Sequence, residues 1–585
     1  MKNKSTIVRE MYLKLLPMQI IGIIVNSINA LIDGLVTTRV LGAKAMSAVG
    51  LYGPVLTIIG VLGVFTVGIQ VSTGQFIGAC KKKDIERLFS TGVIFLATVG
   101  VIISVLLFVF NDPIASILGA KGDIKPLLKS YSNGYMIGVI GQIFSGLCIQ
   151  LLPYNNKTKL AYAGIATLVV VNISLDFLFA MVFKMGTFGM GLATALSYLL
   201  SSFVMFMGFV EADNTVHFSF GKTKLSMLFK AAVLGLPSLS FTLGIALKSF
   251  VLNRTVMKEV GYEMVAVMNV QNNLCAFLGA IPVGAATAYL TLANMFYGED
   301  DKHSLKAAMK YAMRYGLLLS VSVVLVLMGG SSIIASIYFK QGSNSWSICR
   351  SMLLIFPCFL ILNTVYNMMS NTYHAQGRMK IVTAMSGITQ ITAVVLAVVG
   401  LKTIGPKGIW LAYPLNEVVG IAILLAIAFH HARKVSFDHD TIMMVDEDFG
   451  AAEEDLMEFR VRSMRDVVNI SDKIYKFCRS KGINKRYSQY SSLCVEEMAS
   501  NTVKHGFVEG EKHHLDIRVV ARDYVTIRLR DDCQEFDPSK RIEQLNDDDL
   551  ISNIGIRIIS KAAEKVMYQN TIGINTLVMK IKADG

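Results

Sequence analysis

Twelve long apolar runs, separated by mostly short polar loops, are the feature that most constrains how this chain can fold. They cover about residues 15–38, 48–75, 89–110, 131–152, 160–183, 188–210, 231–253, 264–292, 311–337, 349–370, 379–400 and 406–429. A run of about 20 apolar residues crosses a bilayer as one helix, and in lipid the backbone can satisfy its polar groups only within such a helix. The first 430 residues are therefore predicted to form an all-α polytopic membrane protein with 12 transmembrane helices.

The charged residues predict how these spans are oriented. Lys and Arg concentrate in alternate loops, for example at Lys81–Lys83, Lys222 and Lys224, and loops of this kind stay on the cytoplasmic side. Both termini are thus predicted to be cytoplasmic, in a multi-pass protein of the cytoplasmic membrane. The net charge of +14 arises in the membrane part, so it indicates loops beside membrane lipids rather than a nucleic-acid surface. The first run is too long for a signal peptide and is expected to be retained.

The first six runs recur in the second six at an offset near 220 residues. Leu16-Pro17 recurs as Leu236-Pro237, Asp33 falls on Asn253, and Gly78 falls on Gly298. Two six-helix lobes, of residues 1–220 and 221–430, are therefore predicted, an architecture that transporters use for alternating access.

Three acidic residues lie within the apolar runs: Asp33, Asp176 and Glu417. Asn172 and Asp176 are four positions apart, which places them on one helix face. A carboxylate at membrane depth is costly and marks a functional site, although a polar pair that only packs against a neighbouring helix is the alternative. Glu417, near a predicted helix start, is expected to stabilise the helix dipole.

These motifs resemble the multidrug and toxic compound extrusion (MATE) exporters over about residues 10–430. The resemblance rests on Leu16-Pro17, Asp33-Gly34, Leu41-Gly42-Ala43, Met46–Gly50, Asn172-xxx-Asp176 and Gly189–Thr194. It implies a cation-coupled antiporter that exports small organic molecules. It also implies a first-lobe cation site that comprises Asp33, Asn172, Asp176, Thr194 and a tyrosine, Tyr131 or else Tyr135.

The coupling ion is either H⁺ or Na⁺. Low dielectric favours the neutral form of a carboxyl group, which can then take up and release a proton near neutral pH. Amide and hydroxyl oxygens beside a carboxylate are also suitable ligands for a hard cation such as Na⁺. Both possibilities stay open.

The apolar runs end near residue 430. Residues 431–452 are predicted to be a linker, and residues 453–585 an α/β sandwich. Its predicted elements are strands at Leu456–Val461, Leu515–Val520, Val525–Leu529 and Thr576–Ile581, and helices near Met464–Ser480, Arg486–Lys504 and Asp549–Ala563. The eight cysteines include no CxxC pair, so neither a disulfide framework nor a zinc site is expected.

The tail resembles the Bergerat-type, histidine-kinase-like ATPase fold, in the branch of the anti-sigma-factor serine kinases. Glu497-xxx-Asn501 with Lys504 matches the N-box helix, and Asp531 matches the adenine position. The resemblance implies that Glu497 is catalytic and that Asn501 binds Mg²⁺. It implies a nucleotide site for Mg-ATP at Asn501, Lys504, Asp531, Gly555 and Asn575.

Two glycines of that family's adenine loop are replaced here, by Cys533 and Glu535. Since a Cβ hinders close approach of backbone to a ligand, a tail that no longer binds nucleotide is the alternative. No GxxxxGK[ST] phosphate loop is present in the sequence, so the tail should not drive transport as a P-loop ATPase would.

The leading hypothesis is a cation-coupled exporter with a cytoplasmic, nucleotide-binding regulatory domain that could phosphorylate a small partner protein at low turnover. A membrane-anchored signalling kinase with the helical part as its sensor, and a flippase for lipid-linked precursors, are the alternatives.

Overall fold

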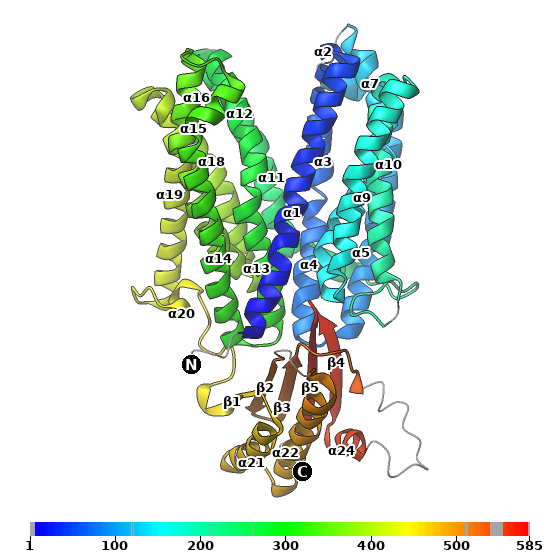
Figure 1. Ribbon diagram of the computed structural model, residues 1–585, viewed down its shortest axis with the longest axis vertical. Coiled ribbons are helices and arrows are strands. Elements are labelled where there is room, and N and C mark those ends of the chain that lie inside the picture. Colours follow the sequence, from blue (N-terminus) through cyan, green and yellow to red (C-terminus); the bar gives the residue numbers. More distant parts are fainter. Residues whose placement is uncertain are drawn as a thin grey trace.

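Two helical bundles stand side by side in the computed structural model, and a smaller α/β domain lies at one end of both (Figure 1). The structure describes residues 6–118, 120, 122–211, 213–260, 262–508, 513–538 and 554–582. We call residues 6–209 the first lobe, residues 225–432 the second lobe and residues 453–582 the tail domain. The lobes lie close together beside the tail domain, on what we call the tail side, and spread apart toward the opposite end (Figure 1).

Every regular element in the described residues of the first lobe is a helix. Its elements are α1 (Thr6–Val36), η1 (Thr37–Leu41), α2 (Ala43–Leu51), α3 (Gly53–Gly60), α4 (Gly63–Gly78), α5 (Lys82–Val109), α6 (Asn111–Ile117), α7 (Ile124–Tyr135), α8 (Gly138–Leu151), η2 (Leu152–Asn155), α9 (Thr158–Phe177), η3 (Leu178–Val182), α10 (Gly186–Phe206) and η4 (Met207–Phe209). Of these, η1 and η3 are π-helical turns, and η2 and η4 are 3₁₀ turns.

The second lobe repeats this pattern. It comprises α11 (Leu225–Glu259), α12 (Tyr262–Leu278), α13 (Ala280–Gly298), α14 (Lys302–Gly329), α15 (Ser331–Tyr338), α16 (Asn344–Ile355), α17 (Cys358–Ala375), α18 (Met379–Ile404) and α19 (Pro406–Ala432). The equivalent long helices α1 and α11 each contain an internal proline, Pro17 and Pro237. Across the two lobes, α1 packs against α13 and α4 packs against α11, so the two contacts are related by the internal repeat.

The predicted all-α polytopic fold is confirmed. Among the described residues, ten helical segments are long and apolar enough to cross a membrane, or eleven if α7 and α8 form one span bent by 54°, against the twelve predicted. The 31-residue helix α1 covers the first predicted run in addition. The structure divides the second predicted run into α2, α3 and α4, and it breaks the fourth between α7 and α8.

The tail domain is a five-stranded antiparallel sheet with helices on one face. Its strands are β1 (Leu456–Val461), β2 (Leu515–Ala521), β3 (Tyr524–Asp531), β4 (Lys565–Thr571) and β5 (Ile574–Lys582), in the order β1-β2-β3-β5-β4. Its helical elements are η5 (Glu453–Asp455), α21 (Met464–Ser480), α22 (Lys485–Asn501), the π-helical turn η6 (Thr502–Gly506) and α24 (Ile554–Ala562). The predicted α/β sandwich is confirmed, but β4 was not predicted. The beginning of the helix predicted near Asp549–Ala563 lies outside the described residues.

Local sequence signals explain why α21 begins and how it packs. Ser463 and Asp466 form a capping box at its start, which satisfies backbone N–H groups that have no partner within the helix. Val467, Ile470 and Ile474 follow at helical spacing and are buried in the apolar core between the helices and the sheet. This face holds the helix on the sheet, because burial of each such side chain stabilises the fold by about 1.5–3 kcal/mol.

The segment predicted as a linker packs on the second lobe instead. It contains a short helix, α20 (His439–Ile442), and the buried side chains of Met443 and Met444. The hydroxyl of Tyr373 donates to the carbonyl of Ile442 at 2.6 Å, and Phe449 stacks on Tyr297. Residues 439–449 therefore form a strap that attaches the tail domain to the second lobe.

The open face of the sheet docks on the turn between α13 and α14 through five charged residues, which we call the arginine–acid cluster. Arg528 donates to Glu299 at 2.5 Å and to Asp301 at 2.6 Å, Arg530 donates to Glu299 at 2.6 Å, and Arg518 pairs with Asp301. Arg518 and Arg528 are cross-strand partners, and Arg528 and Arg530 share a sheet face because side chains alternate along a strand. All five side chains are largely buried.

The electrostatic balance of this cluster favours the charged state of Asp301, whose side chain is 0% exposed. Burial alone would raise its pKa, but the three arginines hold the pKa of Asp301 well below its usual range. Removing one member of such a buried group is strongly destabilising, because it leaves an uncompensated charge. The tail domain and the second lobe are thus joined by a contact that tolerates little rearrangement.

Candidate functional sites in the first lobe and the tail domain

The two membrane acids of the first lobe each lie just before a π-helical turn. Asp33 is in the last turn of α1, ahead of η1, and Asp176 is in the last turn of α9, ahead of η3. The two π-turns contact each other. Such insertions into helices are frequent at functional sites, and here they bring the ends of α1 and α9 together.

The predicted cation-site residues meet at this point. The side chain of Asp33 lies beside those of Asp176 and Thr194, and Thr194 also lies beside the side chain of Tyr131. Neither carboxyl oxygen of Asp176 has a hydrogen-bond partner among the residues that the structure describes. Asp176 is 0% exposed. Two carboxylates that lie this close in a buried site repel each other when both are ionised, so a proton or a cation between them is favoured.

Close helix packing places Tyr131 beside Thr194. A Cβ built on Gly134 would lie 2.2 Å from the carbonyl oxygen of Phe188, and one on Gly191 would lie 2.3 Å from that of Tyr131. Only glycine permits this approach of α7 and α10. Tyr135, the alternative tyrosine, stacks on Tyr131 with ring centroids 6.2 Å apart, but its hydroxyl donates to Gln142.

Asn172 completes the site. It lies one turn before Asp176 on α9 and is fully buried. Neither its amide nitrogen nor its amide oxygen has a hydrogen-bond partner among the residues that the structure describes. A buried amide without a partner costs free energy, so this arrangement fits a ligand that contacts Asn172 and Asp176 together.

The second lobe does not repeat this pair of acids at the equivalent positions of the sequence. The interpretation of Glu417 as a residue near a helix start is wrong, because α19 begins at Pro406 and places Glu417 in the helix interior. Its buried side chain contacts Asn363 of α17. Lys248 of α11 lies over the ring of Tyr413 at 5.9 Å. The side chain of Asn253, the counterpart of Asp33, lies outside the described residues.

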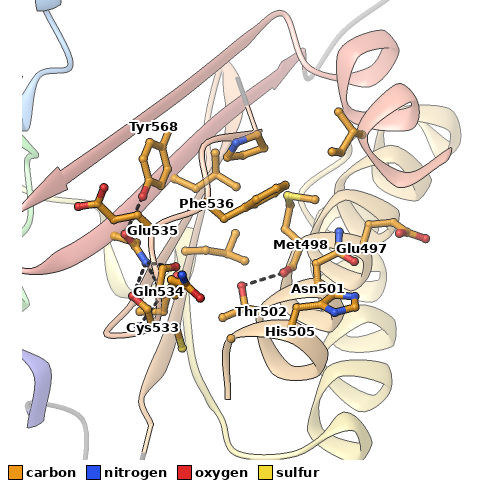
Figure 2. A pocket seen from close by; sticks show the side chains of 17 residues that line it. Glu497, Met498, Asn501, Thr502, His505, Cys533, Gln534, Glu535, Phe536 and Tyr568 are labelled. Atoms are coloured by element: carbon orange, nitrogen blue, oxygen red, sulfur yellow. Dashed lines mark hydrogen bonds between the residues drawn. The ribbon is translucent and has the colours of Figure 1, made fainter. Parts of the chain in front are cut away.

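The tail domain holds a cavity of about 610 Å³ between α22 and the segment that follows β3 (Figure 2). The lining residues are Glu497, Met498, Asn501, Thr502, His505, Gly506, Leu529, Asp531, Cys533, Gln534, Glu535, Phe536, Pro538, Ile556, Tyr568, Asn575 and Leu577. In Figure 2, the α22 side chains face residues 533–536 across the pocket, and Phe536 extends toward Met498. The lining combines apolar side chains with several carboxyl and amide groups, which could fix the orientation of a small molecule.

Glu497, which was predicted to be catalytic, and three of the predicted nucleotide-site residues line this cavity. Glu497 and Asn501 come from α22, which ends in the π-helical turn η6, and Asp531 and Asn575 come from β3 and β5. Lys504 is exposed and is not among the lining residues, and its neighbour His505 lines the cavity instead.

Gly555 is at the start of α24, but its surroundings lie outside what the structure describes; its neighbour Ile556 lines the cavity. Sequence reasoning missed His505 and Tyr568. Tyr568 lies on β4, the strand that was not predicted. An amphipathic pattern over α24 could have suggested Ile556, but nothing local to the sequence marks His505 or Tyr568 as pocket residues.

Asp531 is held in place by hydrogen bonds from two directions. The amide of Asn575 donates to it at 2.8 Å, and the backbone N–H of Cys533 donates at 3.0 Å. Burial raises the pKa of the Asp531 carboxyl, and these two donors oppose that shift. This carboxyl is therefore fixed in orientation at the wall of the cavity.

The two residues that replace glycines are both accommodated. Glu535 lines the cavity. Cys533 packs against Gly506, where an added Cβ would lie 2.9 Å from the Cβ of Cys533. The glycine at the end of η6 thus makes room for the side chain of Cys533.

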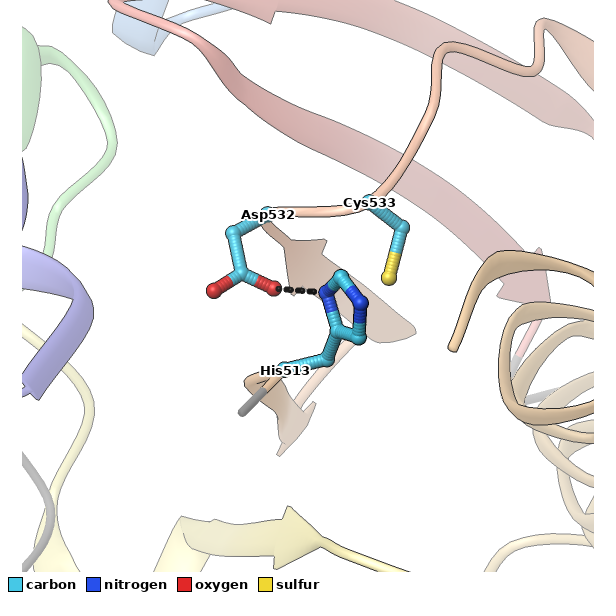
Figure 3. Close-up of side chains that lie close together, drawn as sticks. All are labelled: His513, Asp532 and Cys533. Atoms are coloured by element: carbon cyan, nitrogen blue, oxygen red, sulfur yellow. Dashed lines mark hydrogen bonds and ion pairs between the residues drawn. The ribbon is translucent and has the colours of Figure 1, made fainter. Parts of the chain in front are cut away.

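A histidine holds the first turn of that loop from the other side. Figure 3 shows the His513 ring beside Asp532 and Cys533, with its Nδ1 atom 3.4 Å from Asp532. The backbone N–H of His514 also donates to Asp532, at 2.9 Å. The ligand atoms of His513, Asp532 and Cys533 lie within 4.8 Å of one another, so these three could hold a transition metal ion, an arrangement that cysteine spacing did not predict.

The fold and these two sites define a class of protein: a multi-pass membrane protein of the two-lobed transporter type, fused to a nucleotide-binding type of α/β domain. Residues 17–178 and 237–399 match the MatE family model, and residues 462–581 match the model of the histidine kinase-like ATPase domain. The chain belongs to the MatE family, and its tail is a histidine kinase-like ATPase domain. Both resemblances seen in the sequence are confirmed.

Similar proteins support the same assignment. The multidrug export protein MepA of Staphylococcus aureus strain MRSA252 is 21% identical over 434 residues, which cover 73% of this chain and 94% of that protein. A probable multidrug resistance protein NorM of Halalkalibacterium halodurans is 23% identical over 327 residues, 54% of this chain and 69% of that protein. A structure described as the outward-facing conformation of a multidrug resistance MATE family transporter aligns with a TM-score of 0.67, at 24% identity, over 71% of this chain and 94% of that one.

Proposed function

We propose that this protein exports small organic molecules across the cytoplasmic membrane by exchange for H⁺ or Na⁺. The observation that carries the proposal is the buried contact of Asp33 with Asp176 and Thr194 inside one lobe. Family membership and the names of the similar exporters support it. The helical part would then be the transporter itself rather than the sensor of a kinase.

The coupling step uses the chemistry of this site. When the two acids share a proton, they carry one negative charge between them. Either a second proton or a Na⁺ ion held by oxygens of Asp176, Asn172 and Thr194 would neutralise the site. Tyr131, which lies beside Thr194, would position the Thr194 hydroxyl. Binding and release of the cation would change the charge buried between α1 and α9. The loaded and the empty site would therefore favour different arrangements of these two helices.

The domain division belongs to the same proposal. The two lobes, residues 1–220 and 221–430, would form the transport pathway, residues 431–452 the connection, and residues 453–585 a regulatory domain. The basic loops support a cytoplasmic position for the tail side and for both termini. Lys81 and Lys222 should therefore react with membrane-impermeant reagents from the cytoplasmic side alone.

The tail domain would bind Mg-ATP in the cavity beside α22. Asp531, fixed by Asn575, would accept a hydrogen bond from the adenine amino group, and Asn501 would provide an oxygen to Mg²⁺. Mg-ATP supplies a transferable phosphoryl group when bound. Glu497, one turn before Asn501 on the same helix face, would orient and deprotonate the hydroxyl or water that accepts it. The acceptor hydroxyl could belong to a small partner protein.

Reconstitution into liposomes tests the transport proposal. We expect efflux of ethidium, a small organic cation used as probe, only when an inward-directed H⁺ or Na⁺ gradient is imposed, and the gradient that works identifies the ion. Efflux that requires ATP and ignores both gradients would contradict the proposal.

A truncation tests the regulatory role. The cut should follow residue 452, because a cut after Arg433 would also remove the strap that packs on Tyr373 and Tyr297. The shortened protein is expected to export under an ion gradient and to be insensitive to ATP. If it inserts and folds but cannot transport, the tail domain is part of the transport machinery and the regulatory assignment is wrong.

A further inference from the structure

The β4–β5 hairpin is part of the tail domain, but its tip projects out of that domain and packs among the membrane helices. Thr571 pairs with Ile574 across a two-residue turn. Ile572 is 2% exposed, and both it and Ile574 belong to the apolar core of the membrane helices. Figure 1 shows the two strands reaching from the tail domain to the helix ends.

The first lobe holds this tip through backbone contacts. The N–H of Ile572 donates to the carbonyl of Pro153, in η2, at 3.1 Å. The side-chain amine of Lys14, on α1, donates to the carbonyl of Gly573 at 3.4 Å. The tip is thus attached to two elements that the internal repeat assigns to one lobe.

Two further contacts place the tip at the seam between the lobes. The amide of Gln569 donates to the carbonyl of Ile77, near the end of α4, at 3.3 Å. Thr571 donates to the sulfur of Met295, on α13 of the second lobe, at 3.8 Å. The hairpin therefore touches both sides of the junction that must separate if the lobes open toward the tail side.

The turn itself is costly for its sequence. Ile572 has φ 58° and Gly573 has φ 71°, the combination that a type I′ hairpin turn requires. Glycine adopts positive φ freely, but a β-branched residue there is a genuine outlier. Burial of the Ile572 side chain between the helices offsets that cost only while the tip is docked.

The arginine–acid cluster and the strap fix the tail domain to the second lobe. The hairpin tip is the contact of the tail domain with η2 and α4 of the first lobe. The first contact is ionic and multiply bonded, and the second consists of single hydrogen bonds and two apolar side chains. When the lobes separate on the tail side, the weaker contact is the one expected to break.

The hairpin is also part of the cavity wall. Tyr568 on β4 and Asn575 on β5 line the cavity, and the hydroxyl of Tyr568 donates to Asn575 at 2.6 Å. Asn570 donates to the same oxygen at 2.8 Å, and Asn575 in turn donates to Asp531. One network therefore joins the residue at the adenine position to the residues immediately before and after the tip.

We propose that the hairpin tip is a latch that holds the first lobe against the second on the tail side, and that a ligand in the tail-domain cavity releases it. The latch rests on the proposed function for the two lobes as a transporter that opens toward the tail side, and its release rests on the proposed nucleotide site. A ligand that contacts Asp531 also lies against Tyr568 and Asn575, which line the same cavity. The hydrogen bonds that Tyr568 and Asn570 donate to Asn575 then rearrange, and the tip moves with them.

The experiment measures the distance between the lobes in the full-length protein. Spin labels on unnatural amino acids at the exposed positions Lys81, of the first lobe, and Lys434, just after the second, leave the native cysteines in place. Without substrate or nucleotide, the parent protein should show one short-distance population. Ile572→Asn introduces a residue that accepts positive φ and removes the apolar anchor. We expect this variant to show a several-fold rise in the long-distance population.

Controls separate the latch from general damage. Ile572→Gly, which also suits positive φ, should behave like Ile572→Asn. Val468→Asn removes an apolar side chain that is 60% exposed on α21 and should leave the distances unchanged. If the distances in both Ile572 variants equal those of the parent, the latch is overturned, whatever the transport assays show.

A second arm tests release. Saturating Mg-ATP should raise the long-distance population of the parent several-fold and should add nothing in Ile572→Asn. An equal response in both proteins, or none in the parent, would overturn control of the latch by the cavity. This readout needs no transport, so its failure is distinguishable from a failure of ion-driven export.

Discussion

Gly78 and Gly298 close the tail side of the two lobes through a reciprocal contact. A Cβ on Gly78 would lie 2.0 Å from the carbonyl oxygen of Met295, and a Cβ on Gly298 would lie 2.1 Å from that of Gln75. Both pairs are related by the 220-residue offset of the internal repeat. The two lobes therefore meet across a local twofold relationship, next to the carbonyl of Ile77 that holds the hairpin.

Adding a side chain at this contact should force the lobes apart on the tail side. The backbone cannot yield as a flexible side chain would, so Gly298→Ala is expected to increase the long-distance population between labels at positions 81 and 434 several-fold. Gly60→Ala is the matched control, because a Cβ at Gly60 meets nothing within 4 Å. Identical distance distributions for the two variants would show that this contact does not set the state of the lobes.

Nucleotide binding should depend on Asp531. Calorimetry on the full-length protein is expected to detect Mg-ATP binding that Asp531→Ala removes and that Asp472→Ala, at an exposed ion pair of α21, retains. Protonation would remove the acceptor, and the pKa of Asp531 is raised, so affinity should fall on acidification at a higher pH than an ordinary aspartate would give. No heat from the parent protein at millimolar ATP would favour a tail that no longer binds nucleotide.

Gly506 and Cys533 should be coupled energetically. Gly506→Ala forces a Cβ to within 2.9 Å of the Cβ of Cys533, and such overpacking costs about 1–3 kcal/mol. Cys533→Gly should be tolerated, and the double variant should recover most of the stability that Gly506→Ala loses. Thermal unfolding of the four proteins gives the coupling free energy directly, and additive effects would mean that the two residues do not share this space.

Much of the fold follows from the apolar pattern, but the contacts between the parts do not. The runs predict the helices because lipid leaves few alternatives, and the offset of 220 predicts the lobes. The strand β4 was missed because its turn, Ile572-Gly573, lacks the Asn-Gly or Asp-Gly signal of a tight hairpin. The alternation of Arg528 and Arg530 predicts one polar sheet face, yet their partner Glu299 is more than 200 residues away in the sequence.

The same distinction applies to the candidate sites, where some residues could be predicted from the sequence and others could not. Asp33, Asn172, Asp176 and Thr194 were identified by resemblance to a family and lie together in the structure. The resemblance could not show that His505, and not Lys504, is among the residues that line the tail-domain cavity. Both residues lie in the π-helical turn η6, in which successive side chains are spaced differently from those of an α-helix.

Docking of the tail domain should persist from neutral pH to mildly acidic pH. The pKa of Asp301 in the folded protein lies well below its ordinary value of 3.8, so its stabilising contribution is present above that value and is lost only as the pH falls further. His303 adds a smaller effect of opposite sign, since its hydrogen bond with Glu458 raises its pKa and this contribution disappears as the pH rises. Limited proteolysis between pH 5 and pH 8 should leave the tail domain protected, whereas Glu299→Gln should release it throughout. Release of the parent's tail near pH 6 would contradict this account.

The most direct test of the central claim is ion-driven efflux by proteins that lack one titratable group of the first lobe. Asp33→Asn and Asp176→Asn keep the shape of each side chain, and Glu417→Gln does the same for the buried acid of the second lobe. In liposomes with an inward H⁺ or Na⁺ gradient, we expect both first-lobe variants to export ethidium no faster than empty liposomes, and Glu417→Gln to retain substantial export. If Asp33→Asn and Asp176→Asn both export like the parent protein, coupling does not occur at this site and the account is wrong.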